Sequence, residues 1–337
     1  MSLVVIPGIF LALPAGMLIN KHGFRKIGGT SAVLVAVGSL ITAVSFTYPQ
    51  ALLGRLIIGI GGCFLTIGAA VVIPQWFEPK EIGKAMGIYV AGVPIAVIAA
   101  FFAIPILAQN YGWQTPFYLA SAASIVSAVL FLALVRNGPF RIAGSVGPSD
   151  LKQALSSREL WKIGVIWMLF NMSAIGFLTW APVMFVTFKS LDMIYASIIS
   201  SSIMIVALFL APLYGWASDK IDRRKPFITI GALVTGALNF LIGYLLGFPL
   251  LIAIVLSGFS GAAVPGLVMA IAARTLPQKQ AGISFGVMTM WQNIGITVAA
   301  PLIGYILQTS QSMILTFASI SVLSIVLAGL TVTTRSK

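Results

Sequence analysis

Apolar stretches of about twenty residues recur along the whole chain, separated by short segments that contain charges, Gly or Pro. A helix needs on the order of 20 apolar residues to cross a bilayer whose hydrocarbon core is about 30 Å thick. The pattern therefore predicts eleven membrane-spanning helices, with boundaries set by apolar length and by the breaks. The expected spans are residues 2–20, 28–48, 51–74, 84–107, 115–135, 161–187, 193–215, 227–246, 250–273, 283–307 and 312–333.

The composition agrees with this pattern and excludes several classes of protein. Hydrophobic residues make up 59% of the 337 positions and charged residues 8%, against roughly 45–50% and about 25% in soluble domains. The net charge of +13 would suit a nucleic-acid partner, but the basic residues are scattered among short loops. Cys63 lies in an apolar span and His22 in a loop, and they are the only residues of their types. We expect an all-α polytopic membrane bundle with no nucleic acid, metal or cofactor.

The basic residues also predict the orientation of the chain. All but two of the 20 Lys and Arg residues fall in alternate loops or at the C-terminus; the exceptions are Lys189, in an opposite loop, and Arg55, inside a span. Basic residues accumulate on the cytoplasmic side of membrane proteins. We therefore predict a multi-pass plasma-membrane protein with a cytoplasmic C-terminus, a cytoplasmic linker at residues 136–160 and an N-terminus outside.

A repeat relates the two parts of the chain. At a constant offset of 199 residues, Gly16, Lys21, Arg25, Lys26, Gly59, Gly62, Gly83 and Gly87 correspond to Gly215, Lys220, Arg224, Lys225, Gly258, Gly261, Gly282 and Gly286. Two homologous halves are a known architecture of secondary transporters. The repeat predicts a five-span half at residues 1–135 and a six-span half at residues 161–337.

The repeated loops carry a resemblance to a known family. They read Gly16-Met-Leu-Ile-Asn20-Lys21-His22-Gly23-Phe24-Arg25-Lys26 and Gly215-Trp-Ala-Ser-Asp219-Lys220-Ile-Asp222-Arg223-Arg224-Lys225. Both resemble the signature loop of the major facilitator superfamily, G-x-x-x-D-[RK]-x-G-[RK]-[RK]-[RK]. The departures are Asn20 in place of an acid, Phe24 in place of a basic residue and Asp222 in place of Gly.

This resemblance implies a transporter, secondary active or facilitative, that moves a small solute by rocker-switch alternating access. It also implies a monomer of twelve helices. Because residues 161–187 have no partner 199 residues earlier, we expect the first family helix to be absent, through a late start codon, the choice of expressed segment or real loss.

Arg55 is a candidate for contact with the substrate, in a span that resembles the family's Arg-bearing fourth helix. A charge at this depth costs at least about 2.5–3.5 kcal/mol unless it faces a partner or a wet cavity. Arg55 could attract an anionic substrate or tune a proton-carrying group. The alternative is that it reaches the outer headgroups or pairs with backbone carbonyls.

The resemblance implies that two other spans, residues 161–187 and 283–307, line the substrate cavity. Both contain polar residues. The further substrate-cavity candidates are Trp167, Asn171, Trp291, Gln292 and Asn293. Substrate contact and an interhelical hydrogen bond, typically worth about 0.6 kcal/mol, fit these residues equally well. The glycines of spans 51–74 and 250–273 predict close helix packing.

The signature loops supply gating candidates: Gly16, Asn20, Gly23, Arg25, Lys26, Gly215, Asp219, Arg223, Arg224 and Lys225. The resemblance implies that Asp219 meets a helix N-terminus near Gly83 and Lys84 and acts as a conformational latch, stronger than Asn20. The alternative is that Asp219 only caps a helix end or balances Lys220 and Arg223.

None of the seven acidic residues lies deep in a span, so the coupling ion stays open among a proton, sodium and none. A membrane-embedded sensor or binding scaffold, and an inactive truncated family member, remain alternative functions. An intramembrane enzyme would need a nucleophile with a base, or a metal cluster at depth. The sequence contains neither, so we do not expect an enzyme.

Overall fold

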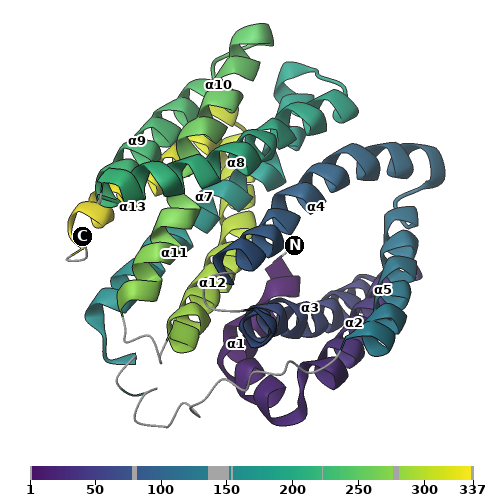
Figure 1. Ribbon diagram of the computed structural model, residues 1–337. Helices are drawn as coiled ribbons and strands as arrows, with labels where there is room; N and C mark the ends of the chain where they lie inside the picture. Colours follow the sequence, from purple (N-terminus) through teal and green to yellow (C-terminus); the bar gives the residue numbers. More distant parts are fainter. Residues whose placement is uncertain are drawn as a thin grey trace. The chain divides into compact units, whose positions relative to one another are not determined.

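The structure, a computed structural model, describes residues 2–77, 82–135, 152, 155–221, 223–275 and 281–334, apart from some side chains near helix ends. Regular structure in these ranges is entirely helical (Figure 1). The helices are α1 Ser2–His22, α2 Phe24–Ala43, α3 Tyr48–Trp76, α4 Ile82–Tyr111, α5 Thr115–Leu134, α7 Arg158–Lys189, α8 Met193–Ile221, α9 Lys225–Ile242, α10 Gly247–Gly261, α11 Ala263–Thr275, α12 Ala281–Ser310 and α13 Met313–Val332.

The predicted spans coincide with these helices, and the span expected at residues 250–273 corresponds to α10 and α11 together. Among the described residues, ten stretches are long and apolar enough to cross a membrane, and α1 contributes a shorter apolar stretch, Leu3–Ala12. Several helices extend past the predicted limits. The apolar criterion marks only the part of a helix that suits the hydrocarbon core, whereas hydrogen bonding along the backbone continues beyond it.

The helix boundaries repeat at the offset found in the sequence. Helix α3 begins at Tyr48 and α10 at Gly247, and α4 spans 82–111 where α12 spans 281–310. Each boundary pair differs by 199 residues. The repeat therefore extends from the loop motifs to the helices themselves.

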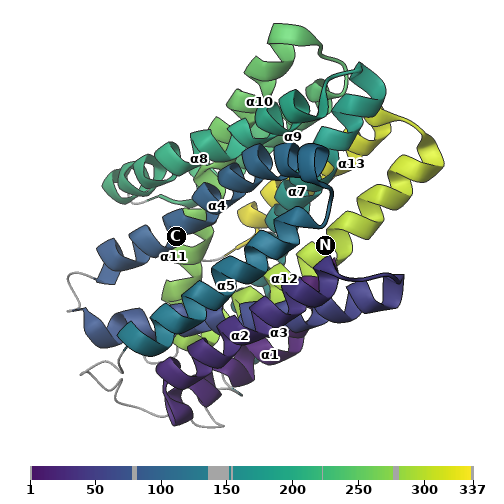
Figure 2. The same cartoon turned by 90° about the vertical axis from the view of Figure 1, so that its right-hand side faces the viewer.

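The chain separates into two compact units, the first comprising Met1–Gly92 with Ile106–Gly147. In this unit α2 packs against both α3 and α5, and α1 packs along α3 (Figure 2). Small residues allow these close approaches: a Cβ on Gly38 would lie 2.6 Å from the carbonyl oxygen of Gly54, and one on Gly59 would lie 2.1 Å from that of Val4. The backbones of α1, α2 and α3 therefore meet where glycine removes the side chain.

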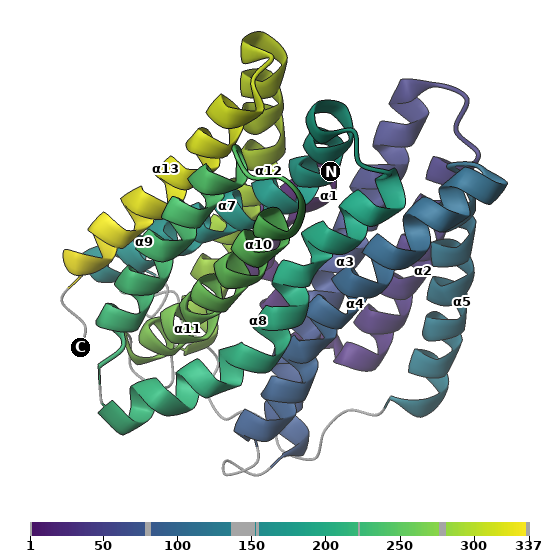
Figure 3. The same cartoon turned by 90° about the horizontal axis from the view of Figure 1, so that it is seen from above.

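The second unit comprises Val93–Pro105 with Pro148–Lys337. Helix α7 contacts α8, α11, α12 and α13, while α9 packs on α10 and α13 (Figure 3). Its close approach at Gly258, where a Cβ would lie 2.9 Å from the Cα of Ile203, repeats the Gly59–Val4 contact 199 residues later. The predicted glycine packing is thus confirmed at Gly59 and Gly258.

Helices α7 and α12 run in the same direction. The contacts between Gly164 and Trp291, between Met168 and Gly295, and between Gly176 and Ile303 each join residues 127 positions apart. A constant separation of this kind is possible only for parallel helices in register. Gly295 lets the backbone of α12 approach that of α7, and Gly164 and Gly176 make room for the side chains of Trp291 and Ile303.

The break between α10 and α11 at Ala262 has a local cause in the sequence. Pro265 has no backbone N–H to donate to the carbonyl of Gly261, and its ring crowds that carbonyl. The position 199 residues earlier is Thr66, and α3 continues through it to Trp76. The bond missing at Gly261 thus accompanies the interruption, whereas Pro182, Pro212 and Pro301 lie inside helices that continue.

Candidate functional site

Arg55 is the charged residue that lies farthest inside a described helix, seven positions after the start of α3. Its side chain is half-buried, and its guanidinium carbon lies 4.6 Å from the centroid of the Phe117 ring on α5. This separation is within the range of a cation–π contact, which is worth about 0.5–2 kcal/mol. The aromatic ring is a neutral neighbour and offers no oxygen to the N–H donors of the guanidinium.

Trp167 and Asn171 lie one helical turn apart on α7 and are 7% and 6% exposed. The amide Nδ2 of Asn171 donates to the backbone carbonyl of Trp167 at 2.8 Å. The Trp167 ring stacks on Phe170 at a centroid distance of 5.5 Å and joins the apolar core that includes Val264 and Leu267. The Asn171 amide thus bonds within its own helix, and both side chains belong to the packed interior of the second unit.

Trp291 on α12 packs against the start of α7. Its ring meets Trp161 edge to face at 5.5 Å, and a Cβ on Gly164 would lie 2.2 Å from its Cδ1. The neighbouring Gln292 and Asn293 are half-buried and make no side-chain hydrogen bond within the described part of the chain. The indole nitrogens of Trp167 and Trp291 are buried without a partner in the same part. The α7–α12 pair therefore offers polar groups whose hydrogen-bonding capacity is not used by the described residues.

The signature loops bring two basic residues to helix C-termini. In the first unit, Nε and Nη2 of Arg25 donate to the carbonyl of Leu132 at 3.0 and 2.6 Å, at the end of α5. In the second unit, Nζ of Lys225 donates to the carbonyl of Thr334, just past the end of α13. The last carbonyls of a helix are unpaired and carry partial negative charge, so a cation there is stabilising. Both contacts lie within one unit, and nothing in the sequence alone signalled them.

The remaining signature residues have varied surroundings. Gly23 has a φ of 82° at the start of α2, a conformation that favours glycine, which explains why this loop position resembles the family pattern. A Cβ on Gly215 would meet nothing within 4 Å, Arg224 is buried, and Lys26 and Arg223 are exposed. The side chains of Asn20, Lys84 and Asp219, the surroundings of Gly16 and Gly83, and all of Asp222 lie outside what the structure describes.

Comparison with known proteins identifies the family. The sequence pattern of the Major Facilitator Superfamily matches residues 1–210 and 190–337. The chain therefore belongs to this superfamily of solute transporters, and it is a multi-pass membrane protein that moves a small solute. The fold agrees with a crystal structure of the fucose:proton symporter FucP of Escherichia coli: the TM-score is 0.70 at 16% identity, covering 99% of this chain and 90% of that one.

Several curated relatives are similar over most of the chain. The probable nitrate transporter NarT of Staphylococcus carnosus is 27% identical over 303 residues, covering 88% of this chain and 75% of its own. A nitrite extrusion protein of Bacillus subtilis is 24% identical over 298 residues, covering 87% and 73%. The probable galactarate/D-glucarate transporter GudP of Escherichia coli is 22% identical over 341 residues, covering 89% and 76%.

Proposed function

We propose that this protein carries a small oxyanion, of the size of nitrate or nitrite, across the plasma membrane by alternating access. The observation that carries the proposal is Arg55, a half-buried cation inside α3 whose contact in the described structure is the Phe117 ring. A charge within a membrane span is costly and is retained where it meets a partner or a wet path. An anion that enters this path would supply such a partner.

The geometry of the two groups supports an oxyanion in particular. The guanidinium is planar and presents its N–H donors in a rigid fork that suits two oxygens of one ligand. The Phe117 ring lies 4.6 Å from the guanidinium carbon and has no oxygen to accept from this fork, so the fork can serve a ligand. The names of NarT, the nitrite extrusion protein and GudP all refer to oxyanions, which agrees with this chemistry.

Transport into proteoliposomes tests the proposal. Uptake of labelled nitrate and nitrite is measured beside D-glucarate and the neutral sugar L-fucose, for the wild type, Arg55→Ala, Arg55→Lys and the charge-matched control Lys152→Gln, which alters an exposed residue. Hydrogen bonds to charged groups are worth about 1.5–3 kcal/mol, so Arg55→Ala should raise the apparent KM for the anion about 10- to 100-fold. Arg55→Lys should keep part of the affinity, and Lys152→Gln should keep all of it.

The proposal fails if folded Arg55→Ala transports nitrate and nitrite like the wild type, or if the wild type carries only the neutral sugar. It also fails if the wild type binds the anion without moving it, since that behaviour belongs to a sensor.

We propose an orientation in which the C-terminus and residues 136–160 face the cytoplasm, with membrane halves at residues 1–135 and 161–337. The asymmetry of Lys and Arg between loops supports it. In a Cys63→Ser background, Ser190→Cys, an exposed position beside Lys189, should react with an impermeant thiol reagent in intact cells. Lys279→Cys should react only after permeabilisation. Equal labelling of the two positions in intact cells would contradict the orientation.

The proposed mechanism includes Asp219 as a latch that holds the cytoplasmic side closed. A carboxylate gains about 0.3–1 kcal/mol at a helix N-terminus, and Asn20, its neutral counterpart, gains less. Asp219→Asn should therefore slow transport more than Asn20→Ala and should increase the labelling of a cavity cysteine from the cytoplasmic side. Normal transport and unchanged labelling in both variants would leave Asp219 as an ordinary loop charge.

A further inference from the structure

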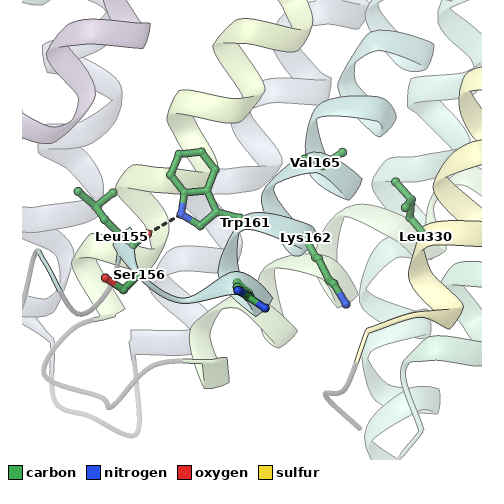
Figure 4. A pocket seen from close by; sticks show the side chains of 7 residues that line it. Leu155, Ser156, Trp161, Lys162, Val165 and Leu330 are labelled. Atoms are coloured by element: carbon green, nitrogen blue, oxygen red, sulfur yellow. Dashed lines mark hydrogen bonds between the residues drawn. The ribbon is translucent and has the colours of Figure 1, made fainter.

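The second unit contains a cavity of about 470 Å³ beside the start of α7 and the end of α13. Seven residues line it: Leu155, Ser156, Arg158, Trp161, Lys162, Val165 and Leu330. Figure 4 shows Lys162 and Val165 on α7, with Leu330 approaching from α13 and Trp161 directed toward Leu155. The lining thus combines two cations, one helical turn apart, with aliphatic and aromatic walls.

The length of α7 places this cavity near a membrane surface. Its 32 residues extend over about 48 Å at 1.5 Å per residue, against a hydrocarbon core of about 30 Å. The first turns of α7 therefore project into the headgroup region. Nζ of Lys162 donates to the carbonyl of Thr333 at 3.3 Å, just past the end of α13, so α13 ends at the same level. This is the side that we propose faces the cytoplasm.

Trp161 supports the same placement. Its indole Nε1 donates to the carbonyl of Leu155 at 2.7 Å (Figure 4), while its ring contacts apolar neighbours. Tryptophan is enriched at membrane interfaces because it has an apolar body and one polar group. The cavity therefore lies where lipid headgroups and the first methylenes of acyl chains meet.

The lining distinguishes among the molecules available at that level. A soluble anion would pair with Arg158 and Lys162, but it has no apolar part to pack against Val165 and Leu330. A zwitterionic lipid would use the walls, but its headgroup has no net charge to match two cations. An anionic lipid satisfies both parts of the lining, and basic pockets between transmembrane helices are known to bind such headgroups.

We infer that this cavity binds an anionic phospholipid, with its phosphate at Arg158 and Lys162 and an acyl chain along Val165 and Leu330. The residues that line it belong to the second unit, whereas Arg55 belongs to the first. The inference depends on the two cations and the apolar residues that line the cavity, and not on the identity of the transported solute.

Trp161 provides a reporter inside the site. Purified, delipidated protein is titrated in detergent with phosphatidylglycerol whose acyl chains are brominated, because bromine quenches tryptophan fluorescence at short range. Brominated phosphatidylcholine is the zwitterionic comparison, and Trp161→Phe identifies the share of quenching that arises in the cavity. We expect saturable quenching of Trp161 by phosphatidylglycerol at a concentration at least tenfold below that needed for phosphatidylcholine.

Variants separate specific binding from general attraction. Arg158→Gln with Lys162→Gln should weaken phosphatidylglycerol binding about tenfold or more. The charge-matched pair Lys26→Gln with Lys220→Gln, exposed and outside the cavity, should change it less than twofold. Val165→Phe enlarges the side chain of the apolar wall, leaves both cations in place and adds no tryptophan, so it should also weaken binding. The single variants Arg158→Gln and Lys162→Gln provide the test if the double variant does not elute as a monodisperse protein.

Three results would overturn the inference. Equal affinity for the two lipids would show an apolar groove without headgroup selection. Equal loss in the two double variants would show attraction by overall charge. Displacement of the lipid by millimolar inorganic phosphate, with no effect of Val165→Phe, would show a site for a soluble anion.

Discussion

The contact between Gly59 and Val4 gives a direct test of the packing that holds α3, and with it Arg55, in place. A Cβ at position 59 would lie 2.1 Å from the Val4 carbonyl oxygen, whereas one at Gly62, on the same helix, would meet nothing within 4 Å. Ordinary contact begins at 3.4 Å, so Gly59→Ala requires α1 and α3 to separate locally by about 1.3 Å, the difference between 3.4 and 2.1 Å. Overpacking of this kind costs about 1–3 kcal/mol.

Both Gly59→Ala and Gly62→Ala gain about 0.5–1 kcal/mol because alanine favours a helix more than glycine does. The difference between the two variants should therefore be the packing cost alone, about 1–3 kcal/mol. The free energy of unfolding is measured in mixed micelles with increasing sodium dodecyl sulfate, and nitrate uptake is measured on the same preparations. We expect Gly59→Ala to be the less stable and less active variant and Gly62→Ala to equal or exceed the wild type. Equal stability of the two variants would refute the argument that the α1–α3 approach depends on Gly59.

Three further predictions follow from contacts within the units. Arg25→Gln should lower the free energy of unfolding by about 0.5–2 kcal/mol, because the C-terminus of α5 loses its cation. Lys26→Gln, which alters an exposed neighbour, should leave it unchanged. If the two variants unfold at the same denaturant concentration, Arg25 does not cap α5. Phe117→Leu should raise the KM for the anion severalfold, because Arg55 loses its aromatic contact. Tyr118→Leu, which alters the adjacent exposed residue, should leave the KM unchanged. Equal KM values for the two variants would show that Phe117 does not contribute to the site. Pro265→Thr gives this position the residue that stands 199 positions earlier, Thr66. It should slow amide hydrogen exchange around Ala262. Unchanged exchange there would show that the break has another cause.

The sequence predicted the helices well because the membrane imposes one simple requirement, a minimum apolar length. The break at Ala262 was not predicted, although its cause, Pro265, is visible in the sequence; a proline within an apolar run gives no indication of whether the helix bends or divides. The repeat and its glycines predicted packing contacts as well as helices. Gly59 and Gly258 were expected to lie at close helix contacts, and the structure shows the same contact in both units.

The candidate site was predicted less completely, for a physical reason. Arg55 stands out because charge is rare in an apolar span. Phe117 does not stand out, since an aromatic residue in such a span is ordinary and only tertiary packing brings it to Arg55. Asn171 was expected to bond to another helix or to a substrate. Its Nδ2 donates to Trp167 in its own helix, and the expected contact stays a prediction. The contacts of Arg25 and Lys225 depend on where α5 and α13 end in space, which loop motifs do not reveal.

The interruption between α10 and α11 has a mechanical consequence for the second unit. Bending stiffness in a helix comes from its unbroken series of backbone hydrogen bonds, and at Gly261 this series lacks the bond that Pro265 cannot donate. The portion from Ala263 to Thr275 can therefore tilt against the portion from Gly247 to Gly261 at a lower energy than an intact helix would require. In α3 the position that corresponds to Pro265 is Thr66, and the next proline of that helix is Pro74, close to its end. Under the same load, α10 with α11 should first yield at Ala262, whereas α3 should bend less at Thr66.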